Sequence, residues 1–310
     1  MELGLFVEPQ VGGSYRRLVE LAQWADDFGL DAFARSDHYL NMDASASATD
    51  ALVSLAGVAA ETTDIRLVTL VSPLTFRHPI VMAKSATTID EISGGRFTLG
   101  VGTGWMQSEH DAFGLDLPPL KERFERLEES LAFIRAIVDG EGTHDGTHYT
   151  LARDDVQPAG TSGLQIVVGG SGPSKTPRLA GTYADEYNMF VTDRETLAAR
   201  QATMAAAAEA AGRDPEDVLM SLAGPAMVFE DEAEHRAEVA KRAERREMSV
   251  EDYVAMLDER NVPHGTPDMA RQAIERMEAL GVGRYYVQEY AALDDVHLDR
   301  MDVTFTALRD

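Results

Sequence analysis

The sequence predicts an α/β protein that folds as a single (β/α)8 TIM barrel. Short apolar runs alternate with amphipathic helical patterns along all 310 residues, and the composition does not break anywhere. No short internal repeat is present, and glycine-rich or polar segments follow several of the apolar runs. This alternation is typical of parallel strands joined by helices. A doubly wound parallel sheet is the alternative, but the glycine-rich loops lack the spacing of a dinucleotide fingerprint.

The first half of the chain supplies four predicted strands, at residues 3–7, 32–34, 65–71 and 97–101. Apolar residues recur at helical spacing between them, which predicts helices over 15–28, 50–62 and 79–93. Ser14 and Gly29 are suited to begin and end the first of these helices. Pro79 suits the first turn of the third, which Gly94 closes.

The second half begins with a long amphipathic helix over 121–138. Residues 139–163 are rich in Gly, Thr and Asp, and we interpret them as a surface hairpin inserted into a single domain that spans 1–310. The predicted strands are residues 165–168, 186–191, 219–228 and 284–288, and the predicted helices are residues 174–183, 194–211, 249–260, 267–280 and 296–308. The mixed-charge run at 230–246 is typical of a solvated helix face.

Charge and composition limit the partners of the protein. The formal net charge of −25 opposes binding to nucleic acid and to anionic membranes, so we expect neither as a partner. No apolar run is long enough to span a bilayer, and the N-terminus lacks the pattern of a signal peptide. The absence of cysteine fits a cytoplasmic location. No metal site is predicted.

Polar side chains follow the second predicted strand at Ser36, Asp37 and His38. In a barrel of this class the ends of the strands face the active site, and histidine is the side chain best suited to proton transfer near neutral pH. Asp37 can set the local charge. The alternative is that His38 is a loop histidine with only a local hydrogen bond.

Two glycine-rich segments also follow strands. Thr103 and Gly104 belong to a loop after 97–101, where glycine permits close approach of the backbone to a ligand. Residues 169–172 precede a predicted helix whose first turns carry Lys175 and Arg178. A glycine turn before a helix N-terminus can bind phosphate, although a bare tight turn explains the glycines equally well.

The chain resembles the luciferase-like monooxygenase superfamily, and within it the branch that uses the deazaflavin coenzyme F420. The matching segments are Ser36 to His38, PLTFRHP at 73–79, SGGRF at 93–97 with GVGTGW at 100–105, GGSG at 169–172 with residues 183–185, and residues 265–267 with 281–282. The resemblance implies a luciferase-like barrel, usually a homodimer, that binds F420 or, alternatively, FMN at the C-terminal ends of the strands.

The resemblance also implies which residues form the site. Asp37 and His38 fall on the family's pair near the reactive carbon of the cofactor, and His38 would act as base or hydrogen-bond donor. The family often carries a non-proline cis peptide after the third strand, which here falls between Leu70 and Val71, or next to it at Val71 and Ser72. The implied cofactor contacts are Asp37, His38, Leu70, Val71, Ser72, Thr103, Gly104, Gly169, Gly170, Ser171, Gly172 and Thr192, the last beside an unfavourable Asp193.

One departure from the family concerns the substrate. Sugar-phosphate dehydrogenases of the F420 branch carry a glutamate where this chain has Trp105, which we place in the substrate pocket. An indole does not transfer protons in that role, so glucose 6-phosphate is not the expected substrate. We expect an F420-dependent oxidoreductase acting on a small-molecule substrate. The alternatives are an FMN-dependent monooxygenase supplied by a separate flavin reductase, and a non-catalytic flavin-binding protein. The resemblance also implies a flavin or F420 reductase as a partner.

Overall fold

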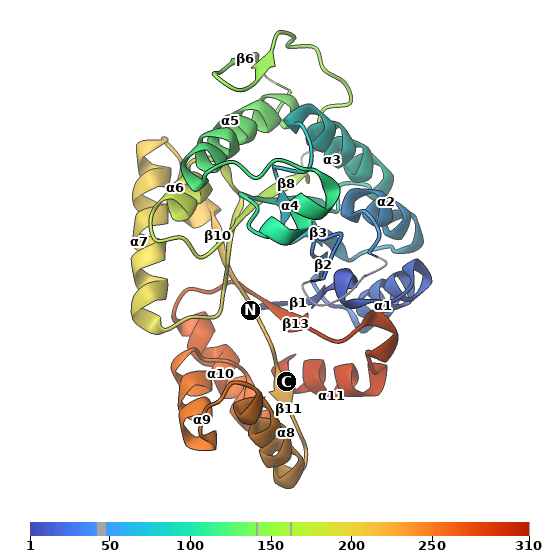
Figure 1. Ribbon diagram of the computed structural model, residues 1–310, viewed down its shortest axis with the longest axis vertical. Coiled ribbons are helices and arrows are strands. Elements are labelled where there is room, and N and C mark those ends of the chain that lie inside the picture. The colour runs from blue at the N-terminus through green and yellow to red at the C-terminus, as the bar shows by residue number, and fades with distance from the viewer. Residues whose placement is uncertain (42–47, 141, 162, 310) are drawn as a thin grey trace.

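A closed barrel of eight parallel strands forms the centre of the computed structural model (Figure 1). The structure describes residues 1–41, 48–140, 142–161 and 163–309. The barrel strands are β1 (Glu2–Val7), β2 (Ala32–Arg35), β3 (Arg66–Thr69), β5 (Phe97–Gly102), β8 (Gln165–Gly169), β9 (Glu186–Phe190), β10 (Leu219–Gly224) and β13 (Arg284–Glu289). The β1 strand pairs with both β2 and β13, and β3 pairs with β5, so the sheet closes on itself. The predicted barrel is therefore confirmed.

Helices surround this barrel. They are α1 (Tyr15–Phe28), α2 (Ala51–Glu61), α3 (Pro79–Ser93), α5 (Leu120–Val138), α6 (Lys175–Tyr183), α7 (Arg194–Ala210), α10 (Pro267–Ala279) and α11 (Leu298–Arg309). The predicted ends of α1 and α3 are confirmed. Ser14 accepts the backbone N–H of Arg17, and Gly29 and Gly94 take the left-handed conformation that ends each helix.

Three helices and several short strands lie outside the regular alternation. The helices are α4 (Gln107–Phe113), α8 (Glu232–Arg245) and α9 (Val250–Glu259). The antiparallel pair β6 (His144–Asp145) and β7 (Thr150–Leu151) lies within the segment interpreted as a hairpin. The β4 strand (Ser72–Pro73) pairs with the end of β5, and β11 (Met227–Val228) pairs with β12 (His264–Gly265). The single strand predicted over 219–228 is thus two strands, because β11 leaves the barrel to pair with β12.

The core lies between the barrel and its helices. Each apolar helix face packs against outward-facing strand residues such as Leu5, Phe33, Leu99 and Ile166, all fully buried. A smaller apolar cluster under α8 and α9 is built around Val239, Tyr253 and Leu257, so the mixed-charge run at 230–246 has one buried side. Among the described residues, the structure has no helix long and apolar enough to cross a membrane.

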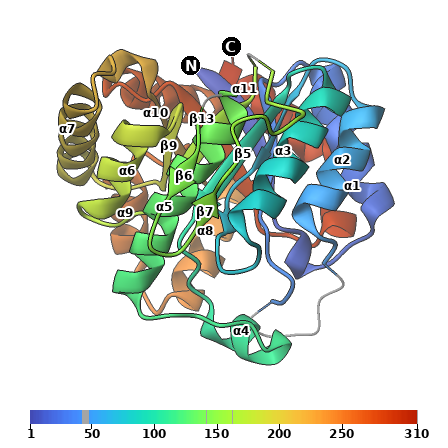
Figure 2. The same cartoon turned by 90° about the horizontal axis from the view of Figure 1, so that it is seen from above.

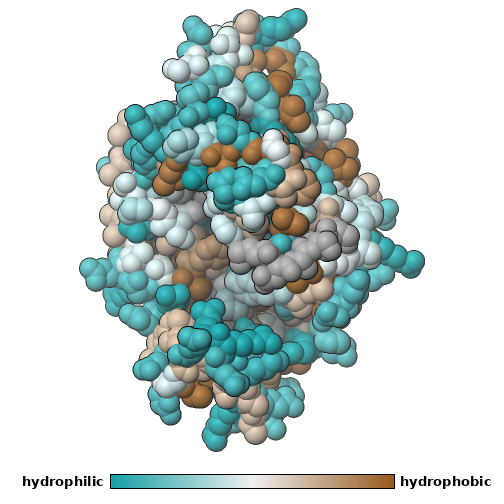
Figure 3. Space-filling view, in the orientation of Figure 1, coloured by the Kyte–Doolittle hydropathy of each residue, from teal (hydrophilic) through white to brown (hydrophobic). Residues whose placement is uncertain are grey.

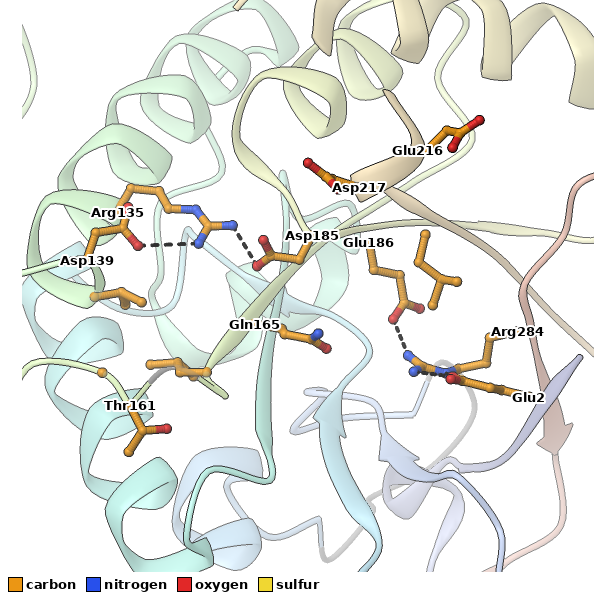
Figure 4. Close-up of a pocket in the computed structure, with 14 residues that line it drawn as sticks. Glu2, Arg135, Asp139, Thr161, Gln165, Asp185, Glu186, Glu216, Asp217 and Arg284 are labelled. Carbon is orange, nitrogen blue, oxygen red and sulfur yellow. Dashed lines mark hydrogen bonds and ion pairs between the residues drawn. The ribbon is translucent and has the colours of Figure 1, made fainter. Parts of the chain in front are cut away.

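The two ends of the barrel differ. The α4 helix follows β5 and lies beyond the C-terminal ends of the strands, at the end opposite to the N-terminus (at the bottom of Figure 2). A cavity of about 670 Å³ opens at the other end, where Arg284 bonds Glu2 and Glu186, and Arg135 bonds Asp185 (Figure 4). These pairs tie the beginnings of β1, β9 and β13 together, and residues at this end of a barrel serve stability.

Candidate active site

The cavity at the C-terminal ends of the strands has a volume of about 500 Å³. It is bounded by the ends of β1, β2, β3, β5, β8, β9 and β13, so it collects loops that are far apart in the sequence. Figure 3 shows hydrophobic surface in the recess near the centre of the molecule, while most of the outer surface is hydrophilic. Of the residues predicted for the site, His38, Leu70, Val71, Thr103, Gly104, Trp105, Gly169 and Gly170 line this cavity.

His38 is held by an acidic residue that the sequence analysis missed. Its Nδ1 lies 2.9 Å from Oε2 of Glu109, in the first turn of α4. The Glu109 side chain is only 1% exposed, and its other oxygen accepts the backbone N–H groups of Tyr39 at 2.5 Å and Leu40 at 3.0 Å. One carboxylate therefore fixes both the imidazole ring and the backbone that follows it.

The charge of this pair bears on the protonation of His38. Burial by itself lowers the pKa of the imidazole, but the hydrogen bond and charge of Glu109, together with the charges of Glu8 and Asp37, outweigh it. The pKa of His38 is therefore raised above its ordinary value of 6.5. Glu109 shifts in the complementary direction: its hydrogen bonds from His38 and the backbone outweigh burial and lower the carboxyl pKa. The contact therefore favours His38 as imidazolium and Glu109 as carboxylate.

Asp37 does not line the cavity. Its fully buried carboxylate faces Arg77 of the PLTFRHP segment, with 2.5 Å between Oδ2 and the guanidinium. Arg77 also bonds Asp50, the residue that caps α2, and the hydroxyl of Tyr39. Asp37 is thus part of a network that ties the end of β2 to α2 and to the loop before α3. It acts on His38 through its charge and by fixing the position of the chain.

The floor of the cavity is built around Val71. The peptide bond between Leu70 and Val71 is cis, which confirms the predicted position. The Val71 side chain lies against glycines of the neighbouring strands: a Cβ at Gly102 would meet it at 2.9 Å and one at Gly169 at 2.6 Å. These glycines therefore make room for the valine. The next residue, Ser72, is fully buried, and its hydroxyl has no hydrogen-bond partner among the described residues.

Most of the residues predicted to bind the phosphate of the cofactor do not face the cavity. Ser171, Gly172 and Thr192 do not line the cavity. The backbone N–H of Gly170 already donates to the carbonyl of Asn188. Thr192 donates to Asp193, whose carboxylate caps α7, and this cap explains an acid at that position.

The two cations predicted to assist phosphate binding interact with α5. Arg178 forms a bidentate pair with Glu128, and the Lys175 ammonium lies 5.2 Å from the centre of the Phe124 ring. Both contacts are long-range, so nothing in the local sequence around α6 indicates them.

The sequence analysis also missed a hydrogen-bonded set of polar side chains on the other side of the cavity, Glu8, Gln10, Ser36, Gln288 and Tyr290, which we call the polar wall. Glu8 accepts hydrogen bonds from the side-chain amides of Gln10 and Gln288, each at 2.5 Å. Ser36 donates to Gln10 at 2.6 Å, and Tyr290 donates to Gln288 at 2.6 Å. These residues come from the ends of β1, β2 and β13, and only the closure of the barrel brings them together.

The arrangement is suited to proton transfer beside a bound planar molecule. His38 is within the cavity, held at one nitrogen, and free to exchange a proton at the other. No group of three histidine or acidic residues able to hold a metal ion occurs in the part of the chain that the structure describes.

The chain is similar to several known proteins. A family model described as luciferase-like monooxygenase matches residues 1–289. An F420-dependent glucose-6-phosphate dehydrogenase of Microbacterium testaceum is 35% identical over 173 residues, 55% of this chain and 51% of that protein. The 4-hydroxyprotoasukamycin monooxygenase of Streptomyces nodosus subsp. asukaensis is 33% identical over 193 residues, 59% of this chain and 51% of that protein.

The alignments thus span about half the length of these curated relatives. Among solved structures, the monooxygenase RslO1 from Streptomyces bottropensis superposes with a TM-score of 0.80 at 23% identity, covering 99% of this chain and 97% of that one. This likeness concerns the fold.

Proposed function

Because the chain belongs to the luciferase-like monooxygenase family, we propose that it is an oxidoreductase that uses coenzyme F420 to transfer a hydride to or from a small organic substrate. The observation that carries the proposal is the contact between His38 and Glu109 in the cavity. The relatives named as F420-dependent dehydrogenases support the choice of cofactor.

The residues at the floor of the cavity fit a flavin-like ring. Leu70 and Val71 offer an apolar surface, and Gly102 and Gly169 keep the backbone open beside it. A bound deazaflavin supplies the hydride chemistry itself.

The protein's part in the reaction is then to orient the ring and to manage the proton. Glu109 holds Nδ1 of His38, so Nε2 is the atom that donates a proton to a substrate oxygen or removes one. The raised pKa of His38 favours the protonated ring, and this form donates a proton. Asp37 and Arg77 fix the chain on which His38 sits.

Two binding isotherms test the choice of cofactor. The purified protein is titrated with F420 and with FMN, and we expect F420 to bind more tightly. Hydride transfer is then followed by the absorbance of F420. Equal or reversed affinities would overturn the F420 assignment and favour an FMN-dependent monooxygenase, for which the Streptomyces nodosus relative is the supporting observation.

Stable binding of either flavin without turnover of any substrate would instead favour the non-catalytic flavin-binding protein. We retain a homodimer, and a flavin or F420 reductase as partner, as further proposals from the family resemblance. Sedimentation of the purified protein measures the first of these.

A further inference from the structure

Three aromatic side chains stand at the opening of the cavity with most of their surface exposed. Trp105 is 60% exposed, Phe190 is 55% exposed and Tyr290 is 53% exposed, and all three line the cavity. They follow β5, end β9 and follow β13, so they come from three separate parts of the barrel. We call these three residues the aromatic rim. Large apolar surface that gathers at a cavity mouth marks a binding site.

The rim is directly connected to the proton-transferring residue. The rings of Trp105 and His38 meet edge to face, with 5.7 Å between their centres. The Tyr290 hydroxyl is held by Gln288 of the polar wall, so this ring has a fixed orientation at the opening. A molecule that contacts the rim is therefore within reach of His38.

The charges beside His38 disfavour an anionic substrate. No lysine or arginine is among the described residues that line it, whereas the buried carboxylates of Glu8 and Glu109 are. Arg242 and Arg246 act electrostatically on the Tyr290 hydroxyl from outside the cavity, but Arg242 is paired with Glu238. Arg246 lies over the ring of Tyr253. A substrate phosphate beside His38 would face the Glu8 carboxylate, and the His38 imidazolium is already paired with Glu109.

From these observations we propose that the substrate is a neutral, planar ring compound whose polar atom is a carbonyl or hydroxyl oxygen. Its ring stacks against the aromatic rim, and its oxygen points to His38. This inference deepens the proposed function and rests on it, since the floor of the cavity is assigned there to the cofactor. Aromatic surfaces select flat apolar partners, because such pairs bury apolar area and favour stacked or edge-to-face contacts.

The two tryptophans of the chain allow a direct test. The indole N–H signals of Trp24 and Trp105 are followed by nuclear magnetic resonance while acetophenone, acetone or glucose 6-phosphate is added, with and without saturating F420. Trp24 lies in a ring cluster with Phe28 and Phe305, so it is an internal control. We expect acetophenone to shift the Trp105 signal in a saturable way and to leave the Trp24 signal unchanged. Acetone should bind more weakly, and glucose 6-phosphate should not saturate.

Variants of the rim sharpen the test. Phe190→Ala and Tyr290→Ala should each weaken acetophenone binding by about twofold to tenfold, the range of one aromatic contact. Tyr15→Ala removes an exposed aromatic ring on α1 and should leave the affinity unchanged. Both rim rings are more than half exposed, so their loss removes little core packing.

Three outcomes would overturn the inference. One is saturable binding of glucose 6-phosphate with an affinity above that of acetophenone. Another is acetophenone binding that the rim variants do not weaken. The third is a Trp105 signal that changes on dilution of the protein alone, which would assign the rim to the contact between two copies of the chain. Failure of F420 to bind would instead defeat the proposed function, and the acetophenone titration in the absence of F420 reports on the rim separately.

Discussion

At the scale of single residues, the site depends on one hydrogen bond between His38 and Glu109. The carboxylate raises the pKa of the imidazole although burial acts in the opposite direction. Since the pKa of His38 is raised and that of Glu109 is lowered, the pair contributes stability that is fully present between pH 4.5 and pH 6.5. This stability is lost as the pH rises through the folded-state pKa of His38 or falls through that of Glu109.

The direction of the His38 pKa shift predicts the effect of Glu109→Gln. In the wild-type protein the His38 ring should titrate above pH 6.5, and in the variant its midpoint should move to lower pH, because burial then acts without the opposing carboxylate. Nuclear magnetic resonance of the labelled ring measures both midpoints without any cofactor. A midpoint that the substitution leaves in place would show that Glu109 does not control the protonation of His38.

His38→Ala should affect turnover much more than folding. The side chain lies at the edge of a cavity, so its removal leaves no large core void. If it transfers the proton, the rate of hydride transfer should fall by roughly 10²–10⁴-fold. His297→Ala, at an exposed position, is the matched control. Wild-type turnover in the His38 variant would show that this histidine makes only a local hydrogen bond and does not transfer the proton.

At the scale of elements, the loop between β8 and α6 brings glycine backbone to the cavity at Gly169 and Gly170. Gly170 has a φ of +143°, a conformation that residues with a side chain rarely adopt. The cations of α6 contribute little to this loop, since Arg178 is paired with Glu128. Any phosphate held here must therefore depend on the backbone itself.

Gly170→Val tests that role. The valine should strain the loop and block the approach of a ligand to its backbone, so intact F420 should bind much more weakly while a phosphate-free deazaflavin should lose less affinity. Gly212→Val places the same strain at a glycine that follows α7 and does not line the cavity. Calorimetric titrations compare the two ligands. Equal losses for both would mean that the loop does not hold phosphate.

At the scale of the whole molecule, the barrel is closed at its N-terminal end by buried charge. Arg284 of β13 is 5% exposed and bonds Glu2 of β1 and Glu186 of β9. Burial alone would lower the pKa of this guanidinium, but the surrounding Tyr286, Glu186 and Glu2 raise it, so the side chain stays charged. Three strands that are distant in the sequence thus share one cation.

Arg284→Ala should destabilise the fold without changing the affinity for a flavin. It leaves the Glu186 carboxylate buried without its cation, and breaking a buried pair in this way costs about 3–5 kcal/mol. Urea unfolding measures this loss. As a control, Arg153→Ala breaks an exposed pair with Asp155 and should cost about 0–1 kcal/mol. Losses of equal size would show that the buried network does not hold the barrel closed.

The sequence by itself determined the barrel, the ends of several helices and much of the cavity. Helices α1 and α3 were predicted to the residue because their caps are local: Ser14 and Gly29 act within one turn of the helix they bound. The end of β2, just before His38, was predicted for the same reason, since a strand and the residues after it are adjacent in the chain. The third strand was predicted to reach Val71 but ends at Thr69, and the position of the cis bond came from the family resemblance.

Only the tertiary structure decided what those residues contact. Glu109 is separated from His38 by 71 positions, and no local pattern links them. The same holds for Glu8 and Gln288, which are 280 positions apart, and for Arg178 and Glu128. Local signals arise from steric preferences and hydrogen bonds within a few residues. The contacts of His38 and Glu8 form because a closed barrel brings the ends of its strands to one face, and that of Arg178 forms because α5 and α6 pack together around the barrel.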